Sequence, residues 1–321
     1  MNIVVSTSKA VFLVDIFNNR TQIIHEGSGL YYGITYTDND LFIAARNNFT
    51  GDRISQQSEA GSILKFDISS GYFDREIKAP FPLRDLHQIS IHDGILYLTC
   101  SYDNKIVIYD FNRWFEWYPN REITNGGVDR NHLNSFLITD SYIYLAAHNL
   151  DKPSEIWCFR NKTKIKLILN RLFGIPLRYN PIKTFTLGKC IHNITKYQGQ
   201  LITLNSQEGL VCGSKGFKFI TGMFPRGLAI CENYIFIGLS EFTERKNRDF
   251  TNSYLCILHK DWKVLKILKF EEMGLLLDIQ TPGYKNDSFQ SYMGKKLPFK
   301  DTKKTVSIPE VLEIGELTIK S

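Results

Sequence analysis

Histidines recur in this sequence at the start of short apolar segments, where they could bind a metal ion or an anionic ligand. The segment "IHNITKYQGQLITLNS" (residues 191–206) has a histidine at its second position, and so does "LHQISIHDGILYLTCS" (86–101). A third segment, "DRNHLNSFLI" (129–138), places His132 two residues before Asn134. Neutral imidazoles that converge from separate segments suit Zn, Mn, Fe or Ni. The first question is therefore what brings these segments together.

The histidine segments belong to a hairpin pattern that occurs five times. Each copy is an apolar strand, a short polar turn and a second strand that ends in small or polar residues. The copies start at residues 31, 86, 133, 191 and 225, and one or two further strand-like segments follow each of them. When the copies are aligned on the turn, one position is occupied in order by Tyr32, His87, Asn134, His192 and Arg226.

Four-stranded units that repeat along a chain predict an all-β fold, here a six-bladed β-propeller. Five blades come from the hairpins. The segment 275–282 ("LLLDIQTP") resembles an inner strand with no partner after it, whereas the strands within residues 2–28 lack an inner strand. We therefore expect both termini to share the sixth blade, which leaves few exposed sheet edges. The predicted domain is 1–283, with 284–321 as a tail that is partly ordered or packed on the propeller.

The propeller model predicts where the aligned position lies. The first strand of each blade lines the central channel, so the five aligned side chains should form one polar ring at its mouth. His132 has the same alternation parity as Asn134 and should point the same way. The second strands return to this face and bring further polar residues. The predicted catalytic residues are His87, His132, His192 and Asp85, and the predicted ligand-binding residues are Tyr32, Asn134, Asn193, Arg226, Arg46, His148, Glu208 and Glu241.

One divalent metal ion is a candidate cofactor, with His87, His132 and His192 as its ligands. Against a metal, the sequence has no HxH or HxxxH spacing and no carboxylate at the aligned position. Hydrogen bonding to the backbone or direct contact with a substrate therefore stays open for each histidine. Asp85 could orient a histidine or act as a base, or it could cap a strand.

Arg226 lies between Pro225 and Gly227, in a turn that can fix the direction of a side chain. A guanidinium beside histidines suits a carboxylate, phosphate or sulfate group. The alternative is a salt bridge between blades, with Glu208 or Asp278 as its partner.

Composition restricts the classes of function. The chain has 321 residues and a net charge of +6, and its Lys and Arg residues are scattered, so we expect no nucleic acid partner. No apolar run reaches the roughly 18 residues of a membrane span, and the N-terminus lacks a signal-peptide pattern. Six cysteines without a CxxC pair predict free thiols and a cytoplasmic location. Phosphate-loop, GxSxG and HExxH motifs are absent.

The segment 161–183 ("NKTKIKLILNRLFGIPLRYNPIK") mixes basic and apolar residues, with helical periodicity around 162–173. We interpret it as an insertion between blades. It is either a packed element on the rim or an amphipathic helix that contacts a partner or a membrane.

Several segments resemble an uncharacterised bacterial family of propeller-like proteins, domain-of-unknown-function family 4915. "DLHQISI" (85–91) is similar to its Asp-Val-His segment, and "DRNHLNSFLI" to its Cys-His-Leu-Asn-Gly motif, with Asn131 and Ser135 in place of Cys and Gly. "FPRGLAICENYIFIGLSEFTER" (224–245) is the closest match. The resemblance covers roughly residues 85–283 and identifies the chain as a divergent member. It implies the fold and the place of a site, but no reaction.

Two classes of function follow from these patterns. The first is a propeller whose channel mouth binds or transforms a polar or anionic small molecule or a sugar, with or without a metal. The second is a non-catalytic binding or scaffold propeller for a protein partner. Polar side chains in the channel favour the first class, and a channel plugged by apolar side chains would favour the second.

Overall fold

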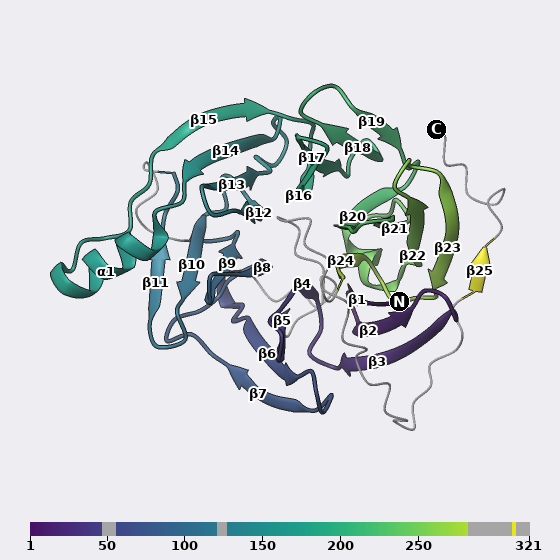
Figure 1. Ribbon diagram of the computed structural model, residues 1–321, viewed down its shortest axis with the longest axis horizontal. Helices are drawn as coiled ribbons and strands as arrows, with labels where there is room; N and C mark the ends of the chain where they lie inside the picture. Colours follow the sequence, from purple (N-terminus) through teal and green to yellow (C-terminus); the bar gives the residue numbers. More distant parts are fainter. Residues whose placement is uncertain (47–55, 121–126, 282–309, 313–321) are drawn as a thin grey trace.

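Six antiparallel sheets stand around a common axis like the blades of a propeller (Figure 1). The computed structural model describes residues 1–46, 56–120, 127–281 and 310–312. The prediction of an all-β, six-bladed propeller is confirmed. Most of the predicted tail, and residues 47–55 of the polar loop after the first hairpin, lie outside the described residues.

Five blades follow the chain in order, each with its first strand nearest the axis (Figure 1). Their strands are β4 (Tyr31–Tyr36), β5 (Asp40–Ala45), β6 (Ser62–Asp67) and β7 (Phe73–Ile77); β8 (Leu86–His92), β9 (Ile95–Cys100), β10 (Lys105–Tyr109) and β11 (Trp114–Trp117); β12 (Leu133–Ile138), β13 (Tyr142–Ala147), β14 (Glu155–Arg160) and β15 (Pro181–Thr186); β16 (Ile191–Tyr197), β17 (Gln200–Asn205), β18 (Leu210–Gly213) and β19 (Lys218–Ile220); and β20 (Phe224–Ile230), β21 (Tyr234–Ser240), β22 (Ser253–His259) and β23 (Val264–Phe270).

The sixth blade combines both ends of the propeller, as predicted. Its order is β24 (Leu276–Gln280), β1 (Asn2–Thr7), β2 (Ala10–Asp15) and β3 (Arg20–Glu26). Strands β24 and β1 are antiparallel, with Val5 opposite Ile279 and Ser6 opposite Asp278. This pairing closes the ring. A further short strand, β25 (Glu310–Leu312), pairs with the outer edge of β23.

Four of the six inner strands begin in the same way. The residue two places before the aligned position has a left-handed backbone at Leu30, Asp85, His132 and Cys190, with φ between 46° and 53°. A register shift follows near the start of each of these strands. Such bulges redirect side chains at the ends of strands. His132 therefore occupies the position of Asp85, one blade further along the chain.

The blades pack through apolar side chains, and their inner strands lie very close together. Between the blades of β8 and β12, Trp117 is fully buried, with its ring centroid 5.0 Å from that of Phe159 and 4.3 Å from that of Tyr179. At the axis, a Cβ on Gly33 would lie 2.6 Å from the backbone nitrogen of Ile89. Only glycine allows this approach. The channel is therefore narrow.

The one α-helix of the described residues, α1 (Thr163–Phe173), projects from the rim (Figure 1). It connects β14 to β15 within one sheet, so the prediction of an insertion between blades is wrong. The segment 161–183 also extends into β15. Two short 3-10 helices, η1 (Gln56–Ser58) and η2 (Arg245–Phe250), lie in loops. Among the described residues, no helix has the length and apolar composition that crossing a membrane requires.

Candidate functional site

The five aligned side chains meet at one pocket between the inner strands, which we name the channel pocket. It encloses about 260 Å³ of space free of protein atoms, solvent at its opening included. A water-sized group can occupy only a small part of that space. Its lining is polar except for one leucine and consists of Tyr32, His87, Gln88, Asn134, Ser135, His192, Asn193, Arg226 and Leu277.

Two of the ring histidines are held by the same kind of hydrogen bond to a serine hydroxyl group. In His87 the Nδ1 atom lies 3.0 Å from Ser101 Oγ, and in His192 it lies 2.7 Å from Ser206 Oγ, each serine being 14 residues later in the chain. Both serines donate their own proton to a backbone carbonyl of the next blade. Each serine oxygen therefore accepts from an Nδ1–H group, which leaves the Nε2 lone pair of both rings unprotonated.

Burial keeps these imidazoles neutral. Desolvation lowers the pKa of His87 well below the usual range, against the opposing charge of Asp85. The pKa of His192 is also well below that range, because of burial and then of nearby Arg226. His192 Nε2 is buried and has no hydrogen-bond partner among the described residues. A neutral acceptor with no partner is available for a donor group on a ligand.

Four histidines form a row along one side of the site. Ring centroids are 4.8 Å apart for His87 and His132, 5.1 Å for His132 and His148, and 5.8 Å for His148 and His192. His132 and His148 do not line the channel pocket but lie beside it. Burial, then the neighbouring His132 and Arg226, lower the pKa of His148 to about 3.

Asp85 is part of a buried ion-pair network. Its Oδ1 lies 2.6 Å from Arg46 Nη1, and the same guanidinium contacts Glu59 through Nε at 2.5 Å and Nη2 at 2.6 Å. Burial by itself raises the pKa of Asp85, but Arg46 and then the neighbouring histidines hold it well below its usual range. Two carboxylates thus occupy most of the N–H donors of Arg46, so few donors remain for a ligand.

His132 forms a second carboxylate pair, with Asp129. Its Nδ1–H donates to Asp129 Oδ2 at 2.6 Å, and the backbone N–H of His132 donates to the other oxygen of the same carboxylate at 3.0 Å. These two bonds fix the ring, so its Nε2 atom carries the free lone pair. A carboxylate that orients an imidazole in this way also occurs in general bases and in metal-binding histidines.

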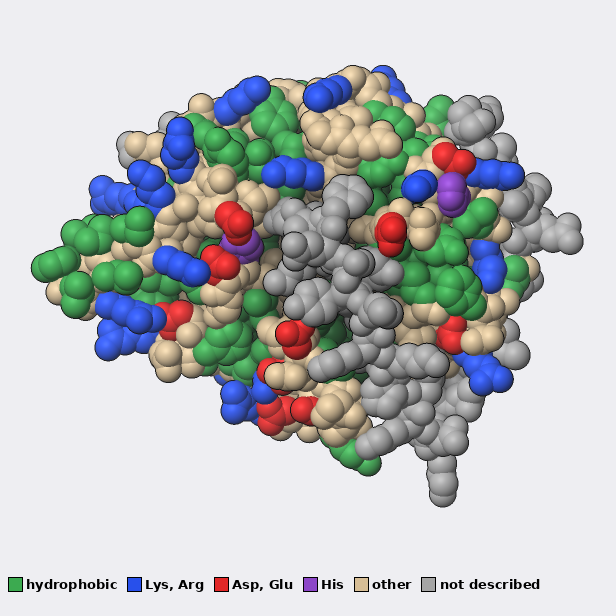
Figure 2. Space-filling model, in the orientation of Figure 1, with side chains coloured by type: hydrophobic (Ala, Val, Ile, Leu, Met, Phe, Trp, Pro, Cys, Tyr) green, Lys and Arg blue, Asp and Glu red, His purple; other side chains and the backbone are tan. Residues whose placement is uncertain are grey.

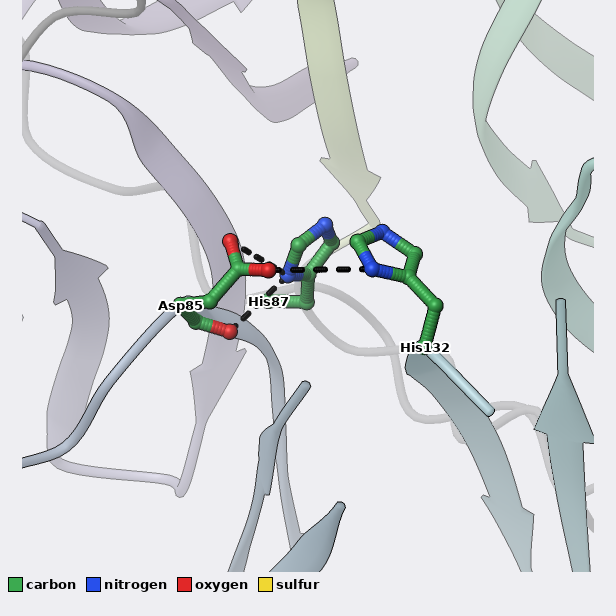
Figure 3. A group of neighbouring side chains, drawn as sticks. All are labelled: Asp85, His87 and His132. Carbon is green, nitrogen blue, oxygen red and sulfur yellow. Dashed lines mark hydrogen bonds and ion pairs between the residues drawn. The ribbon is translucent and has the colours of Figure 1, made fainter. Parts of the chain in front are cut away.

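Asp85, His87 and His132 form one of two compact groups of described residues that could hold a metal ion (Figure 3); the other consists of His92, Asp93 and Asp140. The structure thus groups Asp85, and not His192, with the other two proposed ligands. The Nδ1 atoms lie 3.4 Å and 3.7 Å from the Asp85 carboxylate, but both already take part in the bonds described above. Figure 3 shows both Nε2 atoms on one side, away from Asp85. An ion at the carboxylate would have to displace those bonds.

Arg226 is the buried cation of the channel pocket. Its side chain is 6% exposed, and it forms no ion pair with any residue that the structure describes. The alternative partners Glu208 and Asp278 bond elsewhere. Its guanidinium carbon lies 5.5 Å from the ring centroids of both Tyr32 and Phe224, and its Nε has no hydrogen-bond partner among the described residues. Burying an unpaired charge costs several kcal/mol.

The remaining polar side chains of the channel connect the blades. Gln88 Oε1 accepts from Phe136 N at 2.7 Å, Asn193 Oδ1 from Gly227 N at 2.9 Å, and Asp278 Oδ2 from Ile34 N at 2.9 Å. Asn134 Nδ2 donates to Ile191 O at 2.8 Å. Each of these bonds runs between neighbouring inner strands and satisfies a backbone group there. Burial raises the pKa of Asp278 to about 7, although the hydrogen bonds to Ile34 and Ile279 oppose this rise.

Two predicted ligand-binding carboxylates organise their own loops. Glu208 Oε2 accepts from Asn205 Nδ2 at 2.7 Å, and Glu241 accepts from Thr251, Asn252 and Tyr254 at 2.9 to 3.0 Å. The sequence patterns did not select four residues that bond the side chains of the site without lining the pocket, namely Ser101, Ser206, Glu59 and Asp129. The serines were detectable, because Arg46 and His148 have the same 14-residue offset from Tyr32 and Asn134.

Comparisons with known proteins support the fold. A scan against protein-family models gives no match, and neither does a search of the curated proteins. Among solved structures, a chain of a nidogen/laminin complex aligns with a TM-score of 0.59 at 11% identity, over 87% of this chain and 97% of that one. A protein from Lactobacillus plantarum aligns at 0.51 and 8%, over 87% and 99%. A functionally unknown protein from Desulfotomaculum acetoxidans aligns at 0.49 and 13%, over 86% and 84%. At the identities of the first two, the likeness extends to the propeller architecture alone.

Proposed function

We propose that this propeller binds a small molecule through a carboxylate, phosphate or sulfate group in the channel pocket, with Arg226 as the anchor. The observation that carries the proposal is a buried guanidinium without a carboxylate partner among the described residues. Arg46, in contrast, is bound by two carboxylates. An anion at Arg226 would supply the missing charge and strong hydrogen bonds.

The neighbours of Arg226 support an anionic group with a hydrogen-bond donor beside it. Neutral His192 offers an acceptor in Nε2, and Tyr32 places its ring against the guanidinium. Since only a small part of the pocket admits even a water-sized group, only the anionic end of the ligand enters it. The rest of the ligand then lies outside the inner strands, and its chemistry is not restricted by the channel.

Transformation of this ligand is a second candidate function, supported by the Asp129–His132 pair. With Nδ1–H fixed on the carboxylate, His132 Nε2 would act as a general base towards a hydroxyl group or a water molecule. Asp85 and His87 would complete the polar wall beside it. The scaffold alternative receives less support, because the channel lining is polar rather than apolar.

We also propose that the chain belongs to family 4915 and is located in the cytoplasm. Its propeller domain would comprise residues 1–283, and residues 284–321 would form a tail. The motifs at 85–91 and 129–138 contribute Asp85, His87, Asp129 and His132 to the site. All six cysteines are free, which fits a reducing compartment.

Thermal unfolding with added anions tests anion binding. We expect phosphate, sulfate or succinate to raise the melting temperature of the wild type above that in equal ionic strength of chloride, since a ligand stabilises the state that it binds. Arg226→Gln should abolish the shift, and Arg75→Gln, an exposed arginine on β7, should retain it. A shift that persists in Arg226→Gln, or no shift with any of the three anions, would refute the proposal.

A further inference from the structure

Helix α1 turns its apolar stripe towards solvent. Ile165, Ile168, Leu172 and Phe173 are 60%, 53%, 68% and 69% exposed, and Leu169 extends the same stripe. Their spacing of three, four, seven and eight residues is that of one helix face. The helix buries only Thr163 and Leu167. Surface helices normally bury this stripe against the core, so its orientation here requires another explanation.

Hydrogen bonds hold the helix in this orientation. Thr163 Oγ1 lies 2.9 Å from Tyr179 Oη beneath the helix, and Lys166 donates to the backbone carbonyl of Arg178. At the far end, Asn170 Nδ2 donates to Ile175 O at 2.9 Å, after the left-handed cap at Gly174. The apolar stripe is thus presented at the rim by a folded element.

Positive charge surrounds the stripe. The segment 161–183 contains six Lys and Arg residues and no Asp or Glu. Two of these cations pair with neighbouring blade residues, Lys164 with Asp93 and Arg171 with Asp110, and the others do not form ion pairs with described residues. Figure 2 shows a green apolar tip with blue Lys and Arg side chains on either side.

We propose that α1 and the residues that follow it dock on the surface of an anionic lipid bilayer. The stripe would enter the boundary between headgroups and acyl chains, while the flanking cations contact lipid phosphates. Cations near an anionic surface strengthen the binding, and salt screens their contribution. A second copy of the chain is disfavoured as the occupant, because it would bring a second cationic border against the first.

Sedimentation with lipid vesicles tests the docking surface. The full chain should bind vesicles of phosphatidylcholine with phosphatidylglycerol, and should bind pure phosphatidylcholine at least about tenfold more weakly. The double variant Leu172→Ser/Phe173→Ser should bind the anionic vesicles at least about tenfold more weakly than the wild type. The control Phe17→Ser/Tyr72→Ser removes two large apolar side chains on other blades, which are about as exposed as Leu172 and Phe173. It should bind like the wild type.

Three results would overturn the docking proposal. They are equal binding to neutral and anionic vesicles, unchanged binding by the Leu172→Ser/Phe173→Ser variant, and a dimer in light scattering that this variant converts to a monomer. Both changed residues are exposed, so circular dichroism should show an intact fold. The anion test at Arg226 is unaffected by the outcome, since it concerns the channel pocket.

Discussion

The stability of this protein should depend on pH through its buried neutral histidines. The fold holds the pKa of His87 and His192 well below the usual value, and that of His148 at about 3. An unfolded chain takes up protons on these rings below pH of about 6.5, and the folded chain does not. At pH 5.5 each ring therefore lowers the free energy of unfolding by RT ln(1 + 10), which is between about 1 and 2 kcal/mol. Three rings together give about 4 kcal/mol.

Asp278 acts in the opposite direction. Its pKa of about 7 in the folded chain lies above the value of about 3.9 for an unfolded aspartate. The folded state therefore holds this proton more tightly, and stability is lost as pH rises towards and through 7. Between pH 5.5 and 8 this loss is about 2 kcal/mol. The wild type should consequently be more stable at pH 8 than at pH 5.5 by about 2 kcal/mol, which is the difference between the two effects.

Urea unfolding at pH 5.5 and pH 8 measures this difference. His192→Asn keeps a donor near the position of Nδ1 for Ser206, and should reduce the stability gain towards pH 8 by about 1 to 2 kcal/mol. His148→Gln should do the same, and His259→Asn serves as a control at a half-exposed ring. If neither His192→Asn nor His148→Gln alters the pH dependence by more than about 0.5 kcal/mol, the neutral, buried state of these rings is wrong.

Other predictions use the same structure. Arg226→Met should raise the free energy of unfolding of the ligand-free protein by about 1 to 4 kcal/mol, and a loss of stability would contradict an unpaired buried charge. Asp278→Asn should increase the stability gain between pH 5.5 and 8 by about 2 kcal/mol in the same urea experiment. Deletion of residues 2–16 removes β1 and β2 and should prevent cooperative melting, whereas a truncated chain that melts like the full one would exclude the shared blade. Elemental analysis after growth with Zn, Mn and Fe should find less than one metal per chain, and one bound equivalent that His132→Ala removes would contradict this.

The sequence was sufficient to predict the ring of blades because the inner hairpin keeps its length and pattern while the loops vary. The five hairpins correspond to the first two strands of five blades. The closure of the ring could also be predicted, because the inner strand at 275–282 had no partner after it and the strands within residues 2–28 lacked an inner strand. The sequence did not reveal that α1 lies within a blade. Strand β15 after it is exposed along nearly its whole length, so it lacks the apolar alternation that would reveal a strand.

The channel ring could be found for a similar reason, and so could its supporting serines, while its supporting carboxylates could not. The side chains of Tyr32, His87 and Arg226 share a repeat position, and the structure brings them to one pocket. Glu59 and Asp129 lie in loops, where no periodicity relates them to the ring. Their roles depend on the left-handed turns at Asp85 and His132, which direct the chain into the inner strand. A one-dimensional pattern does not contain that geometry.

Two buried arginines around Tyr32 show how charge is divided in the site. Arg46 and Arg226 both place their guanidinium groups over this ring, at 4.9 Å and 5.5 Å from its centroid. Arg46 is bound by Glu59 and Asp85, so it holds loops and blades together, whereas Arg226 has no carboxylate among the described residues. A folded protein stabilises a buried charge with a partner. We therefore propose that a ligand supplies the negative charge that Arg226 lacks, next to histidines that are themselves neutral.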